Sequence, residues 1–249
     1  MAAPIDLSPV DARLGRAAVH VAALESAVAA YVALPPYRRV EKIDHMTGVM
    51  TVRVDMNQQP PSSIALILSD VAHQLRAALD NLVGCVRPGG PTGDSAFPIT
   101  ADPAKFERDA ARKLEGLPAW AVDAIREIQP FPGDEWQRDV GKQLLDLHDL
   151  ARHDRHRAPR LVAGMVAPDW ASGEDVEFRT DWRTWAETIF KDGRYGSASF
   201  AVTVCLAEPE LPLLDGLEVA GIGQLLSRVV LYHVVEEIRG RARHAAAGR

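Results

Sequence analysis

The chain has 249 residues, 47% of them hydrophobic and 25% charged, and a formal net charge of −6. This composition is that of an ordinary globular protein, and the acidic balance argues against nucleic-acid binding driven by net charge alone. Two cysteines without metal-ligand spacing, no signal-peptide pattern and no run of about 18 apolar residues lead us to expect a cytoplasmic protein without a membrane partner.

The first predicted element is a helix that begins at Ser8-Pro9 and ends before Pro35-Pro36. Its apolar residues recur at alternating spacings of four and three, like the seam of a coiled coil about three heptads long. These residues are Val10, Leu14, Ala17, Val21, Leu24, Val28 and Tyr31. We expect the seam to pack on another helix of the same chain, with a homodimer seam as the alternative.

A β-hairpin is predicted next. The segment Val49–Met56 alternates between two sets of side chains, as a half-buried strand does. Thr47-Gly48 is a turn that leads back from a preceding strand over residues 39–44.

The segment Ser62–Val86 predicts the amphipathic helix around which the chain is organised. Its polar arc contains no Lys and no Glu, although long flexible charges normally fill a solvated helix face. The arc instead carries short or hydrogen-bonding groups: Ser69, Asp70, His73, Gln74, Arg76, Asp80 and Asn81. Such side chains are suited to bonding to one another or to a ligand.

The rest of the chain alternates between helices and strands. Helices are predicted over residues 103–114, 118–128, 140–152, 182–190 and 217–243, the last apolar nearly all round from 225 to 235 and therefore buried. Strands are predicted over residues 160–166, 175–180 and 199–206. Residues 1–249 are therefore expected to form a single α+β domain, in which a mainly antiparallel sheet packs against a bundle of long helices.

The polar arc contains the first group of candidate functional residues. Asp70 can accept a hydrogen bond from His73 and so orient the imidazole for proton transfer or metal binding. Arg76 and Asp80 have the four-residue spacing of an intrahelical ion pair, and Asn81 follows them. The alternative is that these are stabilising pairs on an exposed face, worth only about 0.3–0.5 kcal/mol each.

A second group lies at the end of the helix predicted over residues 140–152. Three of the eight histidines and four arginines lie within residues 148–160. Because arginine binds carboxylate or phosphate at two points, this run predicts an anion-binding patch in which Asp154 anchors the loop. The alternative is that its cations complement the negative C-terminal end of the helix.

Four short motifs resemble those of a group of bacterial proteins of uncharacterised function. The central helix of that group reads roughly D-x-x-H-N-L-R-S-A-L-D-H, and a later motif reads D-K-H-R. The matching segments here are residues 73–80, 97–99, 129–131 and 154–157, with Gln74, Asn81 and Arg155 standing where the group has Asn, His and Lys. The resemblance supports both polar groups as important and names no reaction.

The central helix also resembles the R-x4-H signature of HEPN-type ribonucleases, which are helical, metal-independent and often dimeric. The resemblance places Arg76 at the arginine of that family, while Asn81 stands at its histidine position. It implies an RNA-cleaving activity that needs no metal. The predicted strands do not belong to a plain HEPN helical bundle.

Three functional hypotheses remain open from the sequence. The first is a metal-independent acid–base enzyme, HEPN-like and directed at RNA or another phosphate, with its site between the central helix and residues 154–157. Its catalytic candidates are Asp70, His73, Arg76, Asp80, His156 and Arg157, and its ligand-binding candidates are Asn81, Arg152, Asp154 and Arg155. This hypothesis needs no cofactor and takes a small anionic ligand or RNA as partner.

The second hypothesis is a metal enzyme that holds Zn or Fe with nitrogen and carboxylate ligands from two helices. Its candidate ligands are Asp70, His73, His148 and His156. The third hypothesis is a binding or assembly protein in which the polar arc is a buried structural network. The enzyme hypotheses predict that His73 and His156 converge on one site, although they lie far apart in the sequence.

Overall fold

The computed structural model describes residues 5–34, 37–47, 49–131, 135–153, 157–166, 176–181, 185–190 and 201–247. Its helices are α1 (Ser8–Ala33), α2 (Ser62–Val86), α3 (Pro103–Lys113), α4 (Ala119–Glu127), α5 (Glu135–His153), α6 (Val219–Arg228) and α7 (Glu236–Ala247), and the π-helical segment η1 (Val229–Val235) joins α6 to α7. Its strands are β1 (Tyr37–Asp44), β2 (Val49–Met56), β3 (Leu161–Val166), β4 (Val176–Asp181), β5 (Trp185–Phe190) and β6 (Ala201–Leu206). This mixture of helices and antiparallel strands confirms the α+β class.

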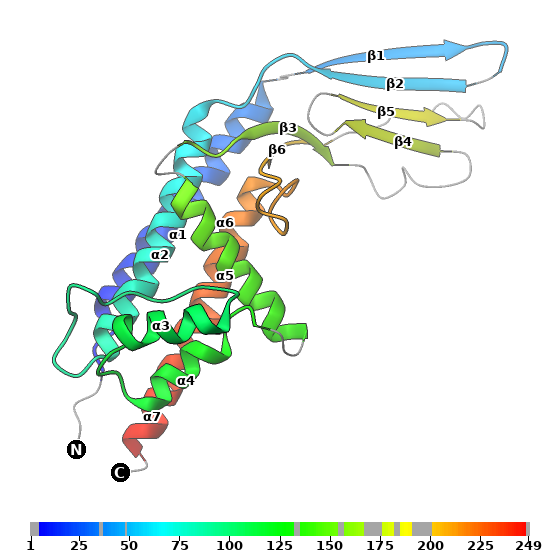
Figure 1. The fold of residues 1–249 in the computed structure, drawn as a ribbon. Helices are drawn as coiled ribbons and strands as arrows, with labels where there is room; N and C mark the ends of the chain where they lie inside the picture. The colour runs from blue at the N-terminus through cyan, green and yellow to red at the C-terminus, as the bar shows by residue number, and fades with distance from the viewer. Residues whose placement is uncertain are drawn as a thin grey trace.

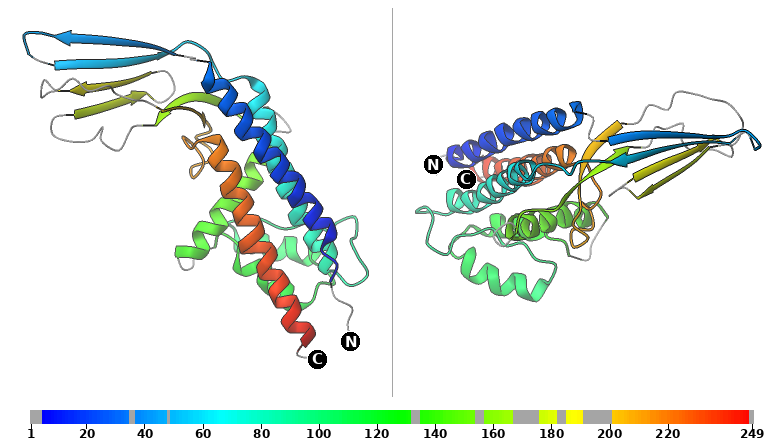
Figure 2. Two further views of the ribbon diagram at one scale, coloured as in Figure 1. Left: turned by 180° about the vertical axis from the view of Figure 1, so that it is seen from behind. Right: turned by 90° about the horizontal axis from the view of Figure 1, so that it is seen from above.

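The helices form one elongated body (Figure 1). α1 and α2 pack on each other in opposite directions, and α6 contacts both of them. α5 packs against α2, and α4 packs against α7. The short helices α3 and α4 lie toward the end of the body that also holds both chain termini, which we call the terminal end (Figures 1 and 2).

The predicted seam of α1 is satisfied within the chain. Val10, Ala17 and Leu24 are buried, and the helix that α1 contacts most extensively is α2. The heptad-like spacing therefore reflects packing between two long antiparallel helices of one chain, as expected. By length and composition alone, α1 is the single helix in the described part of the chain that would be able to cross a membrane.

The strands form a four-stranded antiparallel sheet in the order β1-β2-β5-β4 and a separate antiparallel pair of β3 with β6. The sequence predicts a sheet packed against the helices, whereas the four-stranded sheet extends beyond the end of the body opposite the terminal end (Figures 1 and 2). Charged side chains line its first hairpin, where Arg53 Nε lies 2.6 Å from Asp55 Oδ1. The face that carries these two residues needs no helix to cover it, whereas Met50 and Val52 on the opposite face of β2 are buried. The β3–β6 pair joins the sheet to the body, because β3 contacts β5 while β6 contacts α1 and α6.

The helix predicted over residues 182–190 is wrong. Residues Trp185–Phe190 form strand β5, which pairs with β2 on one side and with β4 on the other, and residues 182–184 lie outside the described residues. Short apolar segments of this length do not distinguish a helix from a strand by periodicity. Pairing with two strands that are distant in sequence decides the outcome here.

The predicted C-terminal helix is present, and its π-helical segment explains its unusual apolar pattern. Its buried core residues Ile222, Leu226, Val230, Val234 and Ile238 follow one another at intervals of four. In an α-helix each such step rotates the side chain by about 40°, and the wider turns of η1 compensate for that rotation. The expectation of burial on every side is wrong, because Tyr232 is 59% exposed.

A glycine allows α5 to approach the segment that follows α4. A Cβ at Gly141 would lie 2.5 Å from the backbone N and Cα of Pro130, which is far inside van der Waals contact. Only a residue without a side chain fits this crossing. The crossing holds Gln129, the residue before Pro130, against the interior of the body, where it is 2% exposed.

Candidate functional site

The polar side chains of α2 contact two neighbours, the helix α1 on one side and the segment around Phe97 on the other. On one side Asp70 Oδ2 lies 3.9 Å from His20 Nδ1 of α1, and Asn81 Nδ2 donates to the carbonyl oxygen of Pro9 at 3.4 Å. Asn81, expected to bind a ligand, therefore contacts α1. His73 lies half-buried on the same arc.

On the other side, Arg76 and Asp80 bind the backbone of a single residue, Phe97. The predicted ion pair is present, with Arg76 Nη2 2.9 Å from Asp80 Oδ1. Asp80 Oδ1 also accepts a hydrogen bond from the Phe97 amide at 2.8 Å, while Arg76 Nη2 donates to the Phe97 carbonyl oxygen. We call these three residues the Phe97 clamp. Both polar groups of the Phe97 backbone are satisfied by side chains of α2.

Gln129 bonds to the residues that follow Phe97. Its Oε1 accepts a hydrogen bond from the Thr100 amide at 3.1 Å, and its Nε2 donates to the carbonyl oxygens of Pro98 at 3.0 Å and Ile125 at 2.9 Å. All three motifs that lie in the described residues therefore meet in space around residues 97–100. In this arrangement their polar atoms bond to backbone, as in a structural network.

His148 of α5 is the titratable group with the largest perturbation near this network. Burial lowers the pKa of its imidazole to about 4, and the positive charge of Arg76 acts in the same direction. The ring is therefore neutral at physiological pH. Two residues before it, burial raises the pKa of the Asp146 carboxyl to about 6, and Asp146 Oδ2 accepts a hydrogen bond from the Leu213 amide at 3.2 Å.

Arg157, predicted to hold an anion, already binds a carboxylate of the chain. Its Nη1 and Nη2 donate to the two carboxylate oxygens of Glu208 at 3.2 and 3.0 Å, and Glu208 is 2% exposed. The amide of Arg160 donates to the same carboxylate at 2.7 Å. Arg152 lies 3.2 Å from Asp149 one turn earlier on α5. The sequence signal for this pairing is an acidic residue, Glu208, shortly after the strand predicted over residues 199–206, and the sequence analysis missed it.

Asp154, Arg155 and His156 lie outside the described residues, so the convergence of His73 with His156 stays a prediction. Within the described ranges, no group of three or more His, Cys, Asp or Glu side chains is placed to hold a metal ion. Asp70, His73 and His148 therefore do not gather there as a set of ligands. The Zn or Fe hypothesis depends on residues outside those ranges.

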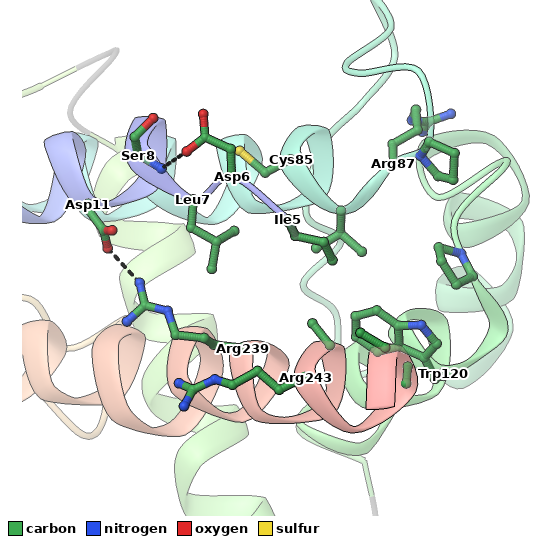
Figure 3. Close-up of a pocket in the computed structure, with 16 residues that line it drawn as sticks. Ile5, Asp6, Leu7, Ser8, Asp11, Cys85, Arg87, Trp120, Arg239 and Arg243 are labelled. Carbon is green, nitrogen blue, oxygen red and sulfur yellow. Dashed lines mark hydrogen bonds and ion pairs between the residues drawn. The ribbon is translucent and has the colours of Figure 1, made fainter. Parts of the chain in front are cut away.

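A cavity of about 890 Å³ lies at the terminal end of the body, and we call it the end cavity (Figure 3). Four segments build it: residues 5–8 with the start of α1, the end of α2 with the loop that follows, the start of α4, and the last turns of α7. Figure 3 shows Ile5 and Leu7 pointing toward α7, with Trp120 beside the end of α7. The lining is mainly apolar, and representative residues are Ile5, Leu7, Val86, Trp120, Ala242 and Ala245.

Charged side chains surround one side of the end cavity. Asp11 Oδ1 lies 2.8 Å from Arg239 Nη2, and Asp6 accepts a hydrogen bond from the Ser8 amide at 2.9 Å (Figure 3). Burial raises the pKa of the Cys85 thiol, and the charges of both aspartates add to this effect. Cys85 is therefore a neutral thiol in the wall at physiological pH.

No protein-family model, curated protein or solved structure matches this chain. The resemblances noted in the sequence therefore stay predictions. Support for a function comes from the geometry of the chain itself.

A second, smaller cavity lies between α1 and the α6–η1 helix, with a volume of about 500 Å³. Its lining includes Leu14, Val21, Ala22 and Leu231. We call it the side groove. It shares no lining residue with the end cavity and so offers an internal control for binding experiments.

Proposed function

We propose that this chain is a binding protein that holds a small, largely apolar molecule in the end cavity. The observation that carries the proposal is the end cavity itself, with its volume of about 890 Å³ and its mainly apolar lining. Small-molecule sites in proteins typically occupy about 300–1,000 Å³ and combine apolar walls with a few polar groups. This is the third hypothesis from the sequence, with a ligand site added to it.

The polar residues first considered catalytic support a structural role. Arg76 is bonded to Asp80 and to the Phe97 carbonyl, and Arg157 is bonded at two points to Glu208. A guanidinium engaged in this way has fewer N–H groups left for a phosphate, and separating Arg157 from the buried carboxylate of Glu208 is costly. Both arginines among the catalytic candidates thus make contacts within the chain.

The Phe97 clamp also positions a wall of the end cavity. The loop over residues 87–102 begins at that wall with Arg87 and Pro88, crosses the clamp and leads into α3. Arg87 Nη2 donates to the Lys113 carbonyl at 2.9 Å, which ties the end of α3 to the end of α2. The chain then reaches the cavity again at Pro118 and Trp120. The clamp therefore fixes the path on which α3 and α4 depend.

A metal-independent acid–base enzyme is the second candidate, and His148 is the observation that favours it. With a pKa lowered to about 4 and Arg76 nearby, its imidazole is neutral at physiological pH and so has one ring nitrogen without a proton, while the same shift makes it a weaker base than an ordinary histidine. Strongly perturbed pKa values are frequent at active sites, although buried structural networks produce them as well.

Titration with Nile red, an uncharged fluorescent probe, tests the binding proposal. We expect saturable binding to the wild type at one site. Ala242→Phe, which fills the end cavity, should weaken it at least about tenfold, whereas Ala22→Phe in the side groove should leave it unchanged. Absence of saturable binding, or sensitivity to Ala22→Phe alone, would refute the proposal. Cleavage of single-stranded RNA by the wild type, abolished in a folded His148→Gln variant, would support the enzyme instead.

A further inference from the structure

Arg87 is a buried cation in the wall of the end cavity. Only 9% of the residue is exposed, and it follows directly after the last residue of α2. Its two terminal nitrogens donate to the carbonyl oxygens of Lys113 and Glu115. Its Nε is buried and has no hydrogen-bond partner among the described residues. Within those residues no carboxylate pairs with Arg87, so its charge is balanced only by carbonyl dipoles.

The other charges around the cavity do not compensate Arg87. Arg239 and Arg243, the other two arginines of the lining, already have carboxylate partners in Asp11 and Glu236. Asp11 is paired with Arg239, and Asp6 lies in solvent and accepts the Ser8 amide. The buried part of the wall is therefore positive. Since a buried guanidinium is most stable beside an anion, the cavity favours a ligand with a single negative charge.

The remaining walls are suited to an apolar body. Ile5 and Leu7 face α7 across the cavity (Figure 3). Ala242 and Ala245 line the cavity from α7, and their small side chains leave room for a ligand. Trp120 supplies a broad aromatic surface beside the end of α7. Apolar burial against these walls is the main source of affinity, while a charged group fixes the orientation of the ligand.

We infer that the end cavity takes an amphipathic monocarboxylate, whose negative charge lies beside the buried guanidinium of Arg87 and whose apolar body lies against Trp120 and α7. This inference rests on the proposed binding function and adds the chemical class of the ligand. Carboxylate is the fitting group because its oxygens accept charge-assisted hydrogen bonds from guanidinium while adding only one charge.

Isothermal titration calorimetry with decanoate and 1-decanol tests the inference, since the two probes share an apolar chain and differ in charge. We expect the wild type to bind decanoate at least about tenfold more tightly than 1-decanol. Arg87→Met should abolish this preference. Arg16→Met is the matched control, because Arg16 is an exposed arginine of α1 that does not line the cavity.

Each outcome decides a separate point. Equal affinity for the two probes would refute the carboxylate while leaving the binding function intact, whereas failure of decanoate, 1-decanol and Nile red to bind would refute the binding function. Arg87 also bonds to the carbonyls of Lys113 and Glu115, so Arg87→Met removes contacts within the chain as well. A second test therefore uses only the wild type and Ala242→Phe. Decanoate should displace Nile red from the wild type, and Ala242→Phe should abolish decanoate binding; retention of decanoate by that variant would place the ligand elsewhere and overturn the inference.

Discussion

Removal of Asp80 should reveal how much the Phe97 clamp contributes to stability. Phe97 is fully buried, so its amide loses the acceptor at 2.8 Å when Asp80 is replaced by Ala. A hydrogen bond to a charged acceptor contributes about 1.5–3 kcal/mol, and a partly exposed ion pair such as that with Arg76 adds about 0.5 kcal/mol. We expect Asp80→Ala to lower the free energy of unfolding by about 2–3 kcal/mol, which for a chain of this size lowers Tm by about 5–10 °C.

Urea denaturation followed by circular dichroism at 222 nm measures this change. Asp80→Asn keeps an oxygen acceptor and loses the charge, so it should cost about half as much. Asp123→Ala is the control, because Asp123 also pairs with an arginine of its own helix but is exposed and binds no buried amide. That control should cost less than about 0.5 kcal/mol.

The same variant connects the clamp to the cavity. If the clamp positions the loop over residues 87–102, Asp80→Ala should also weaken Nile red binding although Asp80 does not line the end cavity. A cost no greater than that of Asp123→Ala, or unchanged probe affinity in a destabilised variant, would refute the reasoning that links the polar arc to the cavity wall.

Further substitutions test the packing and the pH dependence. Leu24→Asp places a charge at a fully buried position of the α1 seam and should unfold the chain, as measured by circular dichroism. Val19→Asp, at a position that is 57% exposed, should leave the chain folded. If light scattering shows a folded monomer of Leu24→Asp, the seam is a dimer seam instead. Gly141→Ala should lower Tm strongly because its Cβ collides with the crossing backbone, while Gly15→Ala, with open space around its Cβ, should stabilise by about 0.5–1 kcal/mol. The folded-state pKa of His148, about 4, lies below its ordinary value of 6.5, so protonation favours the unfolded chain and stability should fall as the pH drops from 6.5 to 4. Urea titrations across that range should show that the free energy of unfolding falls by an amount on the order of 1–2 kcal/mol, which is less than the full pKa shift implies because the ring is partly exposed. This loss should be absent in His148→Gln.

The helices are predictable because their signals are local. Ser62–Val86 is bounded by Pro60-Pro61 and by the breakers after Arg87, and the observed helix has the same limits as the predicted one. The strand Trp185–Phe190 carries no such signal, since its pairing partners lie in β2 and β4. Secondary structure that depends on distant pairing is therefore where the sequence analysis fails.

In the candidate site, too, local contacts are predictable from the sequence and contacts between distant segments are not. The Arg76–Asp80 pair follows from four-residue spacing on a helix, and it is present. Its second partner, the Phe97 backbone, is not predictable from side-chain patterns because every residue carries the same amide and carbonyl groups. The end cavity is harder still to predict, since its walls come from four segments of the chain.

The π-helical segment η1 sets the rotational position of everything that follows it. Because its wider turns hold an extra residue, a deletion inside η1 would let it close to an α-helix and leave α7 in place. Deletion of one residue from α6, for example the exposed Gln224, would instead turn η1 and α7 by about 100° relative to the start of α6. That rotation would carry Arg239 away from Asp11 and move Ala242 and Ala245 out of the end cavity. A length change of one residue, made outside the cavity, would thus erase the cavity while leaving every lining residue in the sequence.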